Sequence, residues 1–264
     1  MQRSLGRRIA VILATVGVIA ANGMATLFSP TGKNVGQISD QFQNFFTPAG
    51  YVFSIWGLIY SAFLAFMVYQ ALPAQAENPR LQRIDGWYML SCAFNAGWIF
   101  VWQREWFLAS EVMMIGLLVT LIVMYVKLDD SRYKVPGKEG WLVHWPVSVY
   151  LGWITIATAA NTTILLQSWG WTGFGLPASA WGAILLSVAF VIVLAVTFPR
   201  RDKAYILVLS WASLGIFVKY KDTMVVAVTA CAIALITFAL AMTLYRQNST
   251  APKAPVLDSS LAPT

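Results

Sequence analysis

Polar and aromatic residues inside long apolar segments are the first candidates for chemistry in this sequence. Asn95 and Trp98 are three residues apart, and Trp153, Ala157 and Asn161 follow one another at intervals of four. In a helix both spacings place side chains on one face, so two helices would each present an indole ring and an amide along one stripe. Ligand pockets are mostly apolar with a few placed polar groups, which is what such a stripe would provide. Hydrogen bonding between helices is the competing explanation of the two amides.

Residues for acid–base or metal chemistry are few. His144 is the single histidine and stands at a helix entrance, and Cys92 and Cys231 lie in apolar segments without ligand spacing. We therefore expect no catalytic residues, no metal site and no required cofactor. Glu111 is the one clear acid inside an apolar segment. We favour a pair between Glu111 and Arg104, and a proton-linked role for the acid is the alternative.

The elements that must position these residues are membrane-spanning helices. Hydrophobic residues make up 58% of the 264 residues and charged residues only 11%, whereas a soluble domain has about 25% charged residues. Apolar blocks near 20 residues suit helices that cross about 30 Å of hydrocarbon and satisfy their own backbone groups. The sequence therefore predicts an all-α integral membrane protein, a polytopic bundle of about eight helices. The expected spans lie near residues 9–28, 51–72, 86–103, 106–126, 145–166, 180–198, 204–219 and 224–245.

The basic residues predict the orientation of this bundle. Short cytoplasmic loops collect Lys and Arg, and with a cytoplasmic N-terminus only Lys33, Arg104, Lys219 and Lys221 of the 18 basic residues fall on the opposite side. We expect a multi-pass protein of a bacterial cytoplasmic (inner) membrane or a thylakoid membrane, with both termini cytoplasmic. Cleavage of the first helix as a signal peptide is the less favoured alternative. Because the basic residues are spread over five cytoplasmic segments, nucleic-acid binding is not expected.

Three segments carry motifs with a family resemblance. Residues 150–161 read YLGWITIATAAN, residues 48–60 read PAGYVFSIWGLIY, and residues 94–98 read FNAGW. They resemble the Y-L-x-W-x-x-x-A-T-x-x-N, P-x-W-V-F with W-x-x-L-Y, and L-N-x-x-W motifs of the TspO/MBR family, the tryptophan-rich sensory proteins and the translocator protein (peripheral benzodiazepine receptor). The chain departs from these motifs at Tyr51, where the family usually has Trp, and in lacking one residue between Phe53 and Trp56.

The resemblance implies a five-helix TspO-like bundle over residues 1–170 and a membrane receptor, sensor or transporter-like protein. Its expected ligand is planar and hydrophobic, above all a porphyrin or another tetrapyrrole. The resemblance covers roughly residues 9–166, so residues 171–246 would add about three transmembrane helices that have no counterpart in the family, and residues 247–264 would form a disordered tail. The expected ligand-binding residues are Tyr51, Trp56, Tyr60, Asn95, Trp98, Trp153, Ala157 and Asn161.

Two other functions compete with ligand binding by a receptor. The chain could be a structural or scaffold subunit that docks other membrane proteins on the three added helices, or an enzyme that degrades porphyrins, as proposed for some family members. The expected partners are the lipid bilayer and a hydrophobic small molecule, with a homodimer or a membrane-protein partner left open. The segment 29–50 is either an interfacial loop anchored by aromatic rings or a lid over a pocket between helices.

Overall fold

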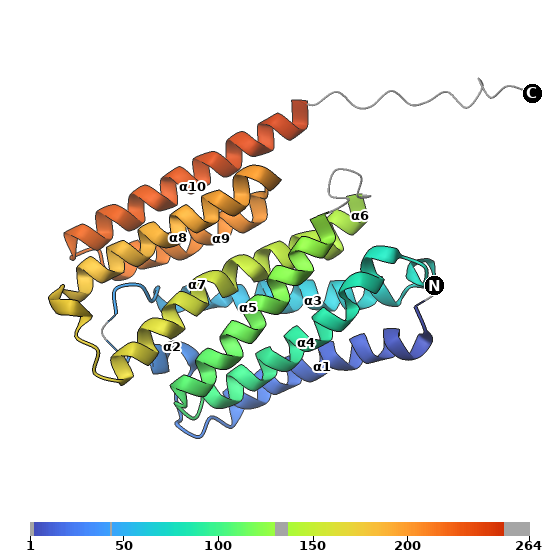
Figure 1. Ribbon diagram of the computed structural model, residues 1–264, viewed down its shortest axis with the longest axis horizontal. Helices are drawn as coiled ribbons and strands as arrows, with labels where there is room; N and C mark the ends of the chain where they lie inside the picture. The colour runs from blue at the N-terminus through green and yellow to red at the C-terminus, as the bar shows by residue number, and fades with distance from the viewer. Residues whose placement is uncertain (1–2, 43, 130–136, 251–264) are drawn as a thin grey trace, which may run out of the picture.

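The polypeptide folds into helices in the part that the computed structural model describes, residues 3–42, 44–129 and 137–250. Eight long helices account for most of these residues, and six short helical segments lie between them (Figure 1). The long helices are α1 (Leu5–Leu27), α3 (Ile55–Ala71), α4 (Pro79–Trp102), α5 (Phe107–Asp129), α7 (Trp145–Ser168), α8 (Ala178–Arg200), α9 (Lys203–Lys219) and α10 (Met224–Thr250). The short segments are α2 (Val35–Ser39), η1 (Gly50–Ser54), η2 (Pro73–Gln75), α6 (Gly137–Glu139), η4 (Gly140–His144) and η5 (Gly173–Gly175).

Six helical segments of the described residues have both the length and the apolar composition of a membrane span. These are Leu5–Leu27, Gly50–Ala71, Phe107–Leu128, Gly137–Ser168, Ala178–Arg200 and Met224–Tyr245. The other two long helices, α4 and α9, lie among protein neighbours: α4 contacts α1 and α5, and α9 contacts α7, α8 and α10. Helix α9 is apolar but has only 17 residues, which is short for a span. Helix α4 is long enough but more polar, and polar residues in a membrane protein face such interior positions. The predicted polytopic helical membrane protein is confirmed.

Helix α4 begins at Pro79, about seven residues before the sequence-predicted span. The side-chain oxygen of Asn78 accepts hydrogen bonds from the backbone N–H groups of Arg80 (3.0 Å) and Leu81 (3.4 Å). A capping Asn followed by Pro at the first helical position is a strong start signal. The first turns of α4 are polar, so hydropathy does not reveal them.

The end of the chain also differs from the expected boundary. Helix α10 continues to Thr250, so the helix occupies the first residues of the predicted tail. The rest of that tail, residues 251–264, lies outside the described residues, as do Arg132 and Lys134 of the predicted cytoplasmic loop. The division into units at residue 170 stays a prediction.

The helices form two neighbouring groups. Helices α1, α3, α4, α5 and α7 pack around one interior, and α8, α9 and α10 lie together beside them (Figure 1). Helix α7 joins the groups by packing on α9 at Gly152, where an added Cβ would lie 3.1 Å from the Cβ of Val208 and 3.2 Å from the carbonyl oxygen of Tyr205. Against α8, in contrast, α7 makes few contacts. The interface between α7 and α8 is therefore a much looser junction of the two groups than the interface between α7 and α9.

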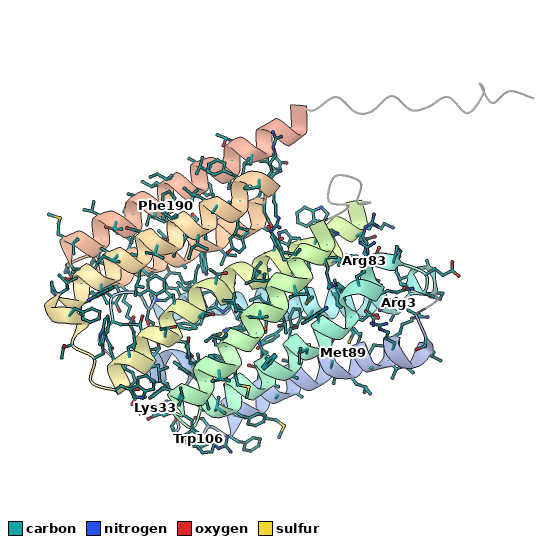
Figure 2. The ribbon with its side chains drawn as sticks, viewed as in Figure 1. Arg3, Lys33, Arg83, Met89, Trp106 and Phe190 are labelled. Carbon is teal, nitrogen blue, oxygen red and sulfur yellow. The ribbon has the colours of Figure 1, made fainter. Side chains whose placement is uncertain are left out.

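A buried ion pair fixes the start of the chain to the bundle. The Arg3 guanidinium donates to both carboxylate oxygens of Asp85 at 2.8 and 2.7 Å and to the side-chain oxygen of Gln70 at 2.8 Å. Arg7 adds a second ion pair to Asp85 at 3.2 Å. These contacts connect the chain at the start of α1 with α3 and α4. Figure 2 shows Arg3 and Arg83 at one end of the bundle and Lys33 and Trp106 at the opposite end.

The segment of residues 29–42 and 44–49, called here the lid segment, covers that opposite end. Its short helix α2 has a capping box, in which Asn34 and Gln37 bond to each other's backbone N–H groups at 2.9 and 2.8 Å. The segment is attached to α9 by a Lys219–Asp40 ion pair and by a 2.6 Å hydrogen bond from the Tyr220 hydroxyl to the Asn44 carbonyl. Both interpretations of this segment stay predictions, and the name describes only its position over this end of the bundle.

Candidate functional site

Three indole rings from three helices meet in the interior of the first group. Trp56 of α3 stacks on Trp98 of α4 with ring centroids 6.1 Å apart, and lies edge to face with Trp153 of α7 at 6.3 Å. Trp98 continues the stack to Trp102 at 5.6 Å. Offset and edge-to-face pairs of this kind are favourable packing arrangements for aromatic rings. The sequence-predicted tryptophans therefore form one continuous cluster.

The cluster lines a small space, called here the tryptophan cavity. Trp56, Trp98, Trp153, Ala157 and Asn161 line it, and residues of the lid segment form another part of its wall. Its volume is about 40 Å³, far below the roughly 300–1,000 Å³ of most ligand pockets. In this conformation the rings are packed against one another, so a large ligand requires them to separate. The lid residues that contribute to the wall are Val35, Ser39, Thr47 and Pro48.

Trp153 carries an unused donor at this cavity. The residue is 2% exposed, and its indole nitrogen Nε1 has no hydrogen-bond partner within the described structure. Its ring is held by Phe53, edge to face at 5.8 Å. A buried donor without an acceptor costs about 1–3 kcal/mol, so the indole N–H is available to an acceptor brought by a ligand or by water.

Asn161 is the centre of a polar network beside the cavity. Its side-chain oxygen accepts from the indole N–H of Trp98 at 3.2 Å and from the hydroxyl of Ser110 at 2.7 Å. Its amide nitrogen donates to Oε2 of Glu111 at 2.7 Å, and the hydroxyl of Thr162 donates to Oε1 of the same acid at 2.7 Å. The Asn161 side chain thus joins helices α4, α5 and α7 through buried hydrogen bonds.

The predicted pair between Glu111 and Arg104 is wrong. Glu111 is buried and its carboxylate points to Asn161 and Thr162 of α7. Arg104 lies in the turn after α4, where its guanidinium donates to the carbonyl of Phe100 at 3.0 Å and lies over the ring of Trp106. An acid inside a span gains more from buried donors on a neighbouring helix than from a cation at the membrane surface.

Asn95, Tyr60 and Tyr51 do not line the tryptophan cavity. Asn95 is fully engaged with two other helices: it accepts from the amide of Asn22 at 2.8 Å and donates to the hydroxyl of Tyr150 at 2.6 Å. Its amide therefore serves the interhelical bonding that was the competing explanation. Tyr60 stacks on Trp56 at 5.5 Å. Tyr51 is 45% exposed and packs on Trp211 of α9 at 5.4 Å, so the Trp-to-Tyr departure falls outside the cavity.

Several residues of the site were not predicted from the sequence. Phe53 and Trp102 belong to the aromatic cluster, and Ser110 and Thr162 belong to the polar network. The last two were detectable, because each is the chain neighbour of a buried polar residue, Glu111 or Asn161, and polar neighbours inside a span indicate a shared partner. The lid residues gave no such signal, since their contact with the cavity depends on the fold of a long connecting segment.

These features define a class: a polytopic helical membrane protein with an aromatic and amide-lined interior site. The model of the TSPO-like protein family matches residues 8–243. The chain belongs to this family, which indicates a receptor- or transporter-like membrane protein. The match extends through α8 and α9 into α10, so the expectation that the last three helices have no counterpart in the family is wrong. Neither curated proteins nor solved structures gave a match.

Proposed function

We propose that this protein is a membrane receptor for a planar hydrophobic ligand, and that the ligand is a tetrapyrrole such as a porphyrin. The observation that carries the proposal is the buried indole N–H of Trp153, which lacks an acceptor at a cavity walled by three converging indole rings. A flat macrocycle offers π-faces to stack on Trp56 and Trp98, and its polar edge offers the acceptor that Trp153 lacks. Asn161 is held beside the same space by its hydrogen bonds.

Binding requires the tryptophan cavity to widen, and the lid segment is the wall that we propose to move. Its attachments to the bundle include polar contacts, namely the Lys219–Asp40 pair, the Tyr220 hydroxyl on the Asn44 carbonyl, and Glu105 on Lys33 and Gln41. Beside them, the apolar side chains of Ile38 and Phe46 are buried in the core and must move with the segment. Polar contacts near the membrane surface exchange with water at low net cost. The helices that form the other walls of the cavity are packed together, so water cannot replace their mutual contacts in the same way.

The test is a spectral titration of the purified protein with protoporphyrin. We expect a saturable Soret shift for the natural chain, and an affinity about tenfold lower, or about 1.4 kcal/mol, for Trp153→Phe. Trp141→Phe is the matched control, because Trp141 is exposed and remote from the cavity. Equal affinities of the two variants would overturn the assignment of the site.

The same titration separates the two competing functions. A scaffold subunit would give no saturable shift, whereas a porphyrin-degrading enzyme would consume the chromophore with time. Family membership favours a protein without enzymatic activity. We also propose a bacterial cytoplasmic or thylakoid membrane with cytoplasmic termini, supported by the distribution of the basic residues.

A further inference from the structure

A second and larger cavity lies between α7 and α8, away from the tryptophan cavity, and is called here the lateral cleft. Its volume is about 420 Å³, which is within the range of ligand sites. Its walls come from the C-terminal part of α7, the first half of α8, the turn between these helices and residues 44–46 of the lid segment. All the residues that line it are apolar or uncharged polar residues.

One end of the lateral cleft is rigidly built. The indole N–H of Trp181 donates to the carbonyl of Gly173 at 2.8 Å, and the ring of Trp171 packs on that of Trp181 at 5.0 Å. At Gly182, α8 approaches the lid so closely that an added Cβ would lie 2.5 Å from the Cβ of Phe45. The cleft is therefore formed by fixed contacts of α8 with its own preceding turn and with the lid.

Asn44 supplies an unused donor among the residues that line the cleft. It is 3% exposed, and its side-chain oxygen accepts from the backbone N–H groups of Phe46 (3.2 Å) and Thr47 (2.8 Å) and from the Thr47 hydroxyl (2.8 Å). Three donors around one atom identify it as the oxygen, which fixes the orientation of the amide. The amide nitrogen Nδ2 then has no partner within the described structure. A buried NH₂ group of this kind requires an acceptor such as a carbonyl oxygen.

The depth of the cleft matches one leaflet of a bilayer. Residues 159–167 of α7 line it, and eight residue steps of helix rise about 12 Å, close to half of the roughly 30 Å hydrocarbon thickness. Trp171 and Trp181 lie at the end of this stretch, and indole rings prefer the headgroup level. Ester carbonyls of membrane lipids lie near this level and their acyl chains extend inward from it. With uncharged walls, the cleft suits a neutral carbonyl better than a carboxylate.

We propose that the lateral cleft binds one membrane lipid, its acyl chain between α7 and α8 and its ester carbonyl accepting a hydrogen bond from Nδ2 of Asn44. The bound chain fills the loosely packed junction between α7 and α8 and so joins α8 to the first group of helices. This site takes a different ligand from the tetrapyrrole proposal and shares with it only the lid segment, which carries Asn44.

The test is native mass spectrometry of delipidated protein in mild detergent, with dioleoylphosphatidylcholine, oleate or protoporphyrin added separately. Leu185→Trp places a larger side chain in the cleft, and Val188→Trp is the matched control on an exposed position of the same helix outside the cleft. We expect one phosphatidylcholine retained by the natural chain and by Val188→Trp, and retention about tenfold lower for Leu185→Trp. Oleate should not be retained.

A second variant removes the donor without filling the cleft. Asn44→Asp keeps an oxygen for the three donors of residues 46 and 47 but replaces the NH₂ group by a carboxylate oxygen, so phosphatidylcholine retention should fall while the empty protein still folds. Equal retention by the natural chain, Leu185→Trp and Asn44→Asp would overturn the proposal, as would retention of oleate or protoporphyrin that depends on Leu185. The Trp153→Phe titration tests the tetrapyrrole site separately.

Discussion

The amide nitrogen of Asn161 and the carboxylate of Glu111 are joined by a 2.7 Å hydrogen bond between α7 and α5. The two residues are 50 positions apart in the chain, and both are buried in the membrane-spanning part of the bundle. The bond satisfies an acid that would otherwise be isolated in an apolar surrounding. It also orients Asn161, whose oxygen remains available to Trp98 and Ser110.

A double-mutant cycle should reveal this bond. Glu111→Leu and Asn161→Leu each leave the other polar group buried with fewer partners, so we expect each to destabilise the protein by about 1–3 kcal/mol. The double variant should lose about 1–2 kcal/mol less than the sum of the two. The free energy of unfolding in mixed micelles measures this. In the control cycle Thr163→Val takes the place of Asn161→Leu, because the Thr163 hydroxyl bonds within its own helix at 2.8 Å. The losses in this control cycle should add. Additive losses in both cycles would contradict the expectation.

The sequence predicted the tryptophan cluster well because its members lie on regular helix faces. Trp153, Ala157 and Asn161 follow the helical period, and all three line the cavity. The same rule did not distinguish Asn95 from Trp98, since spacing gives the face of a helix but not the partner that meets it. Asn95 finds its partners 73 and 55 positions away, in Asn22 and Tyr150.

The partners of Glu111 and the lateral cleft show why the remaining features could not be predicted from the sequence. A pair with Arg104 was plausible because the two residues are close in sequence, yet the turn after α4 directs Arg104 back to Phe100. The cleft depends on how far α8 stands from α7, which is set by the turn at residues 169–177 and by the contact of Gly182 with Phe45. Neither the turn geometry nor that contact follows from periodicity or composition.

The buried ion pair at the start of α1 should be strongly stabilising. The side chains of Arg3 and Asp85 are both fully buried, so Asp85→Asn leaves a buried guanidinium without its counter-ion and should cost about 3–5 kcal/mol of unfolding free energy. Asp40→Asn makes the same substitution in the exposed pair with Lys219 and should cost about 1 kcal/mol or less. Similar losses in the two variants would show that the burial of Asp85 is not decisive.

The attachment of the lid to the turn after α4 should depend on pH through Glu105. The hydrogen bond from Gln41 has the largest effect on the pKa of Glu105, and together with the hydrogen bond and charge of Lys33 it lowers this pKa below its usual 4.5 against the opposing effect of burial. A lowered pKa in the folded state means that the contribution to stability is present above about pH 4.5 and is lost as the pH falls through the lowered value.

Melting temperatures of the natural chain and Glu105→Gln, measured from pH 7 downward, check this. The natural chain should be the more stable at neutral pH, and the difference should vanish in acid. In a Gln41→Ala background the neutral-pH difference should be smaller, because the largest cause of the shift is gone. A difference that is constant across this range would rule out Glu105 as the titrating group.

Cysteine labelling should establish the orientation of the bundle. Ala74 and Thr172 are exposed at connections that the predicted topology places on opposite sides of the membrane. In a background without Cys92 and Cys231, Ala74→Cys should label only from the cytoplasm and Thr172→Cys only from the other side. Ser131, in the predicted cytoplasmic loop, lies outside the described residues and should label together with position 74. Labelling of positions 74 and 172 from the same side would refute the predicted topology.

Loosening the lid should change how fast a ligand enters the tryptophan cavity. The Tyr220 hydroxyl donates to the carbonyl of Asn44 at 2.6 Å, a contact that exists only while the lid segment lies on the end of α9. Tyr220→Phe removes this hydrogen bond and keeps the ring that packs on Phe45 at 5.0 Å. Loss of a bond worth about 1 kcal/mol should raise the population of open molecules about fivefold, and the association rate of protoporphyrin with it.

Stopped-flow mixing with protoporphyrin measures the association rate of Tyr220→Phe. Tyr245→Phe is the control, since Tyr245 is an exposed residue of α10 away from the lid. Its association rate should equal that of the natural chain. If Tyr220→Phe also leaves the association rate unchanged while protoporphyrin still binds, the ligand reaches the tryptophan cavity between helices and not past the lid segment.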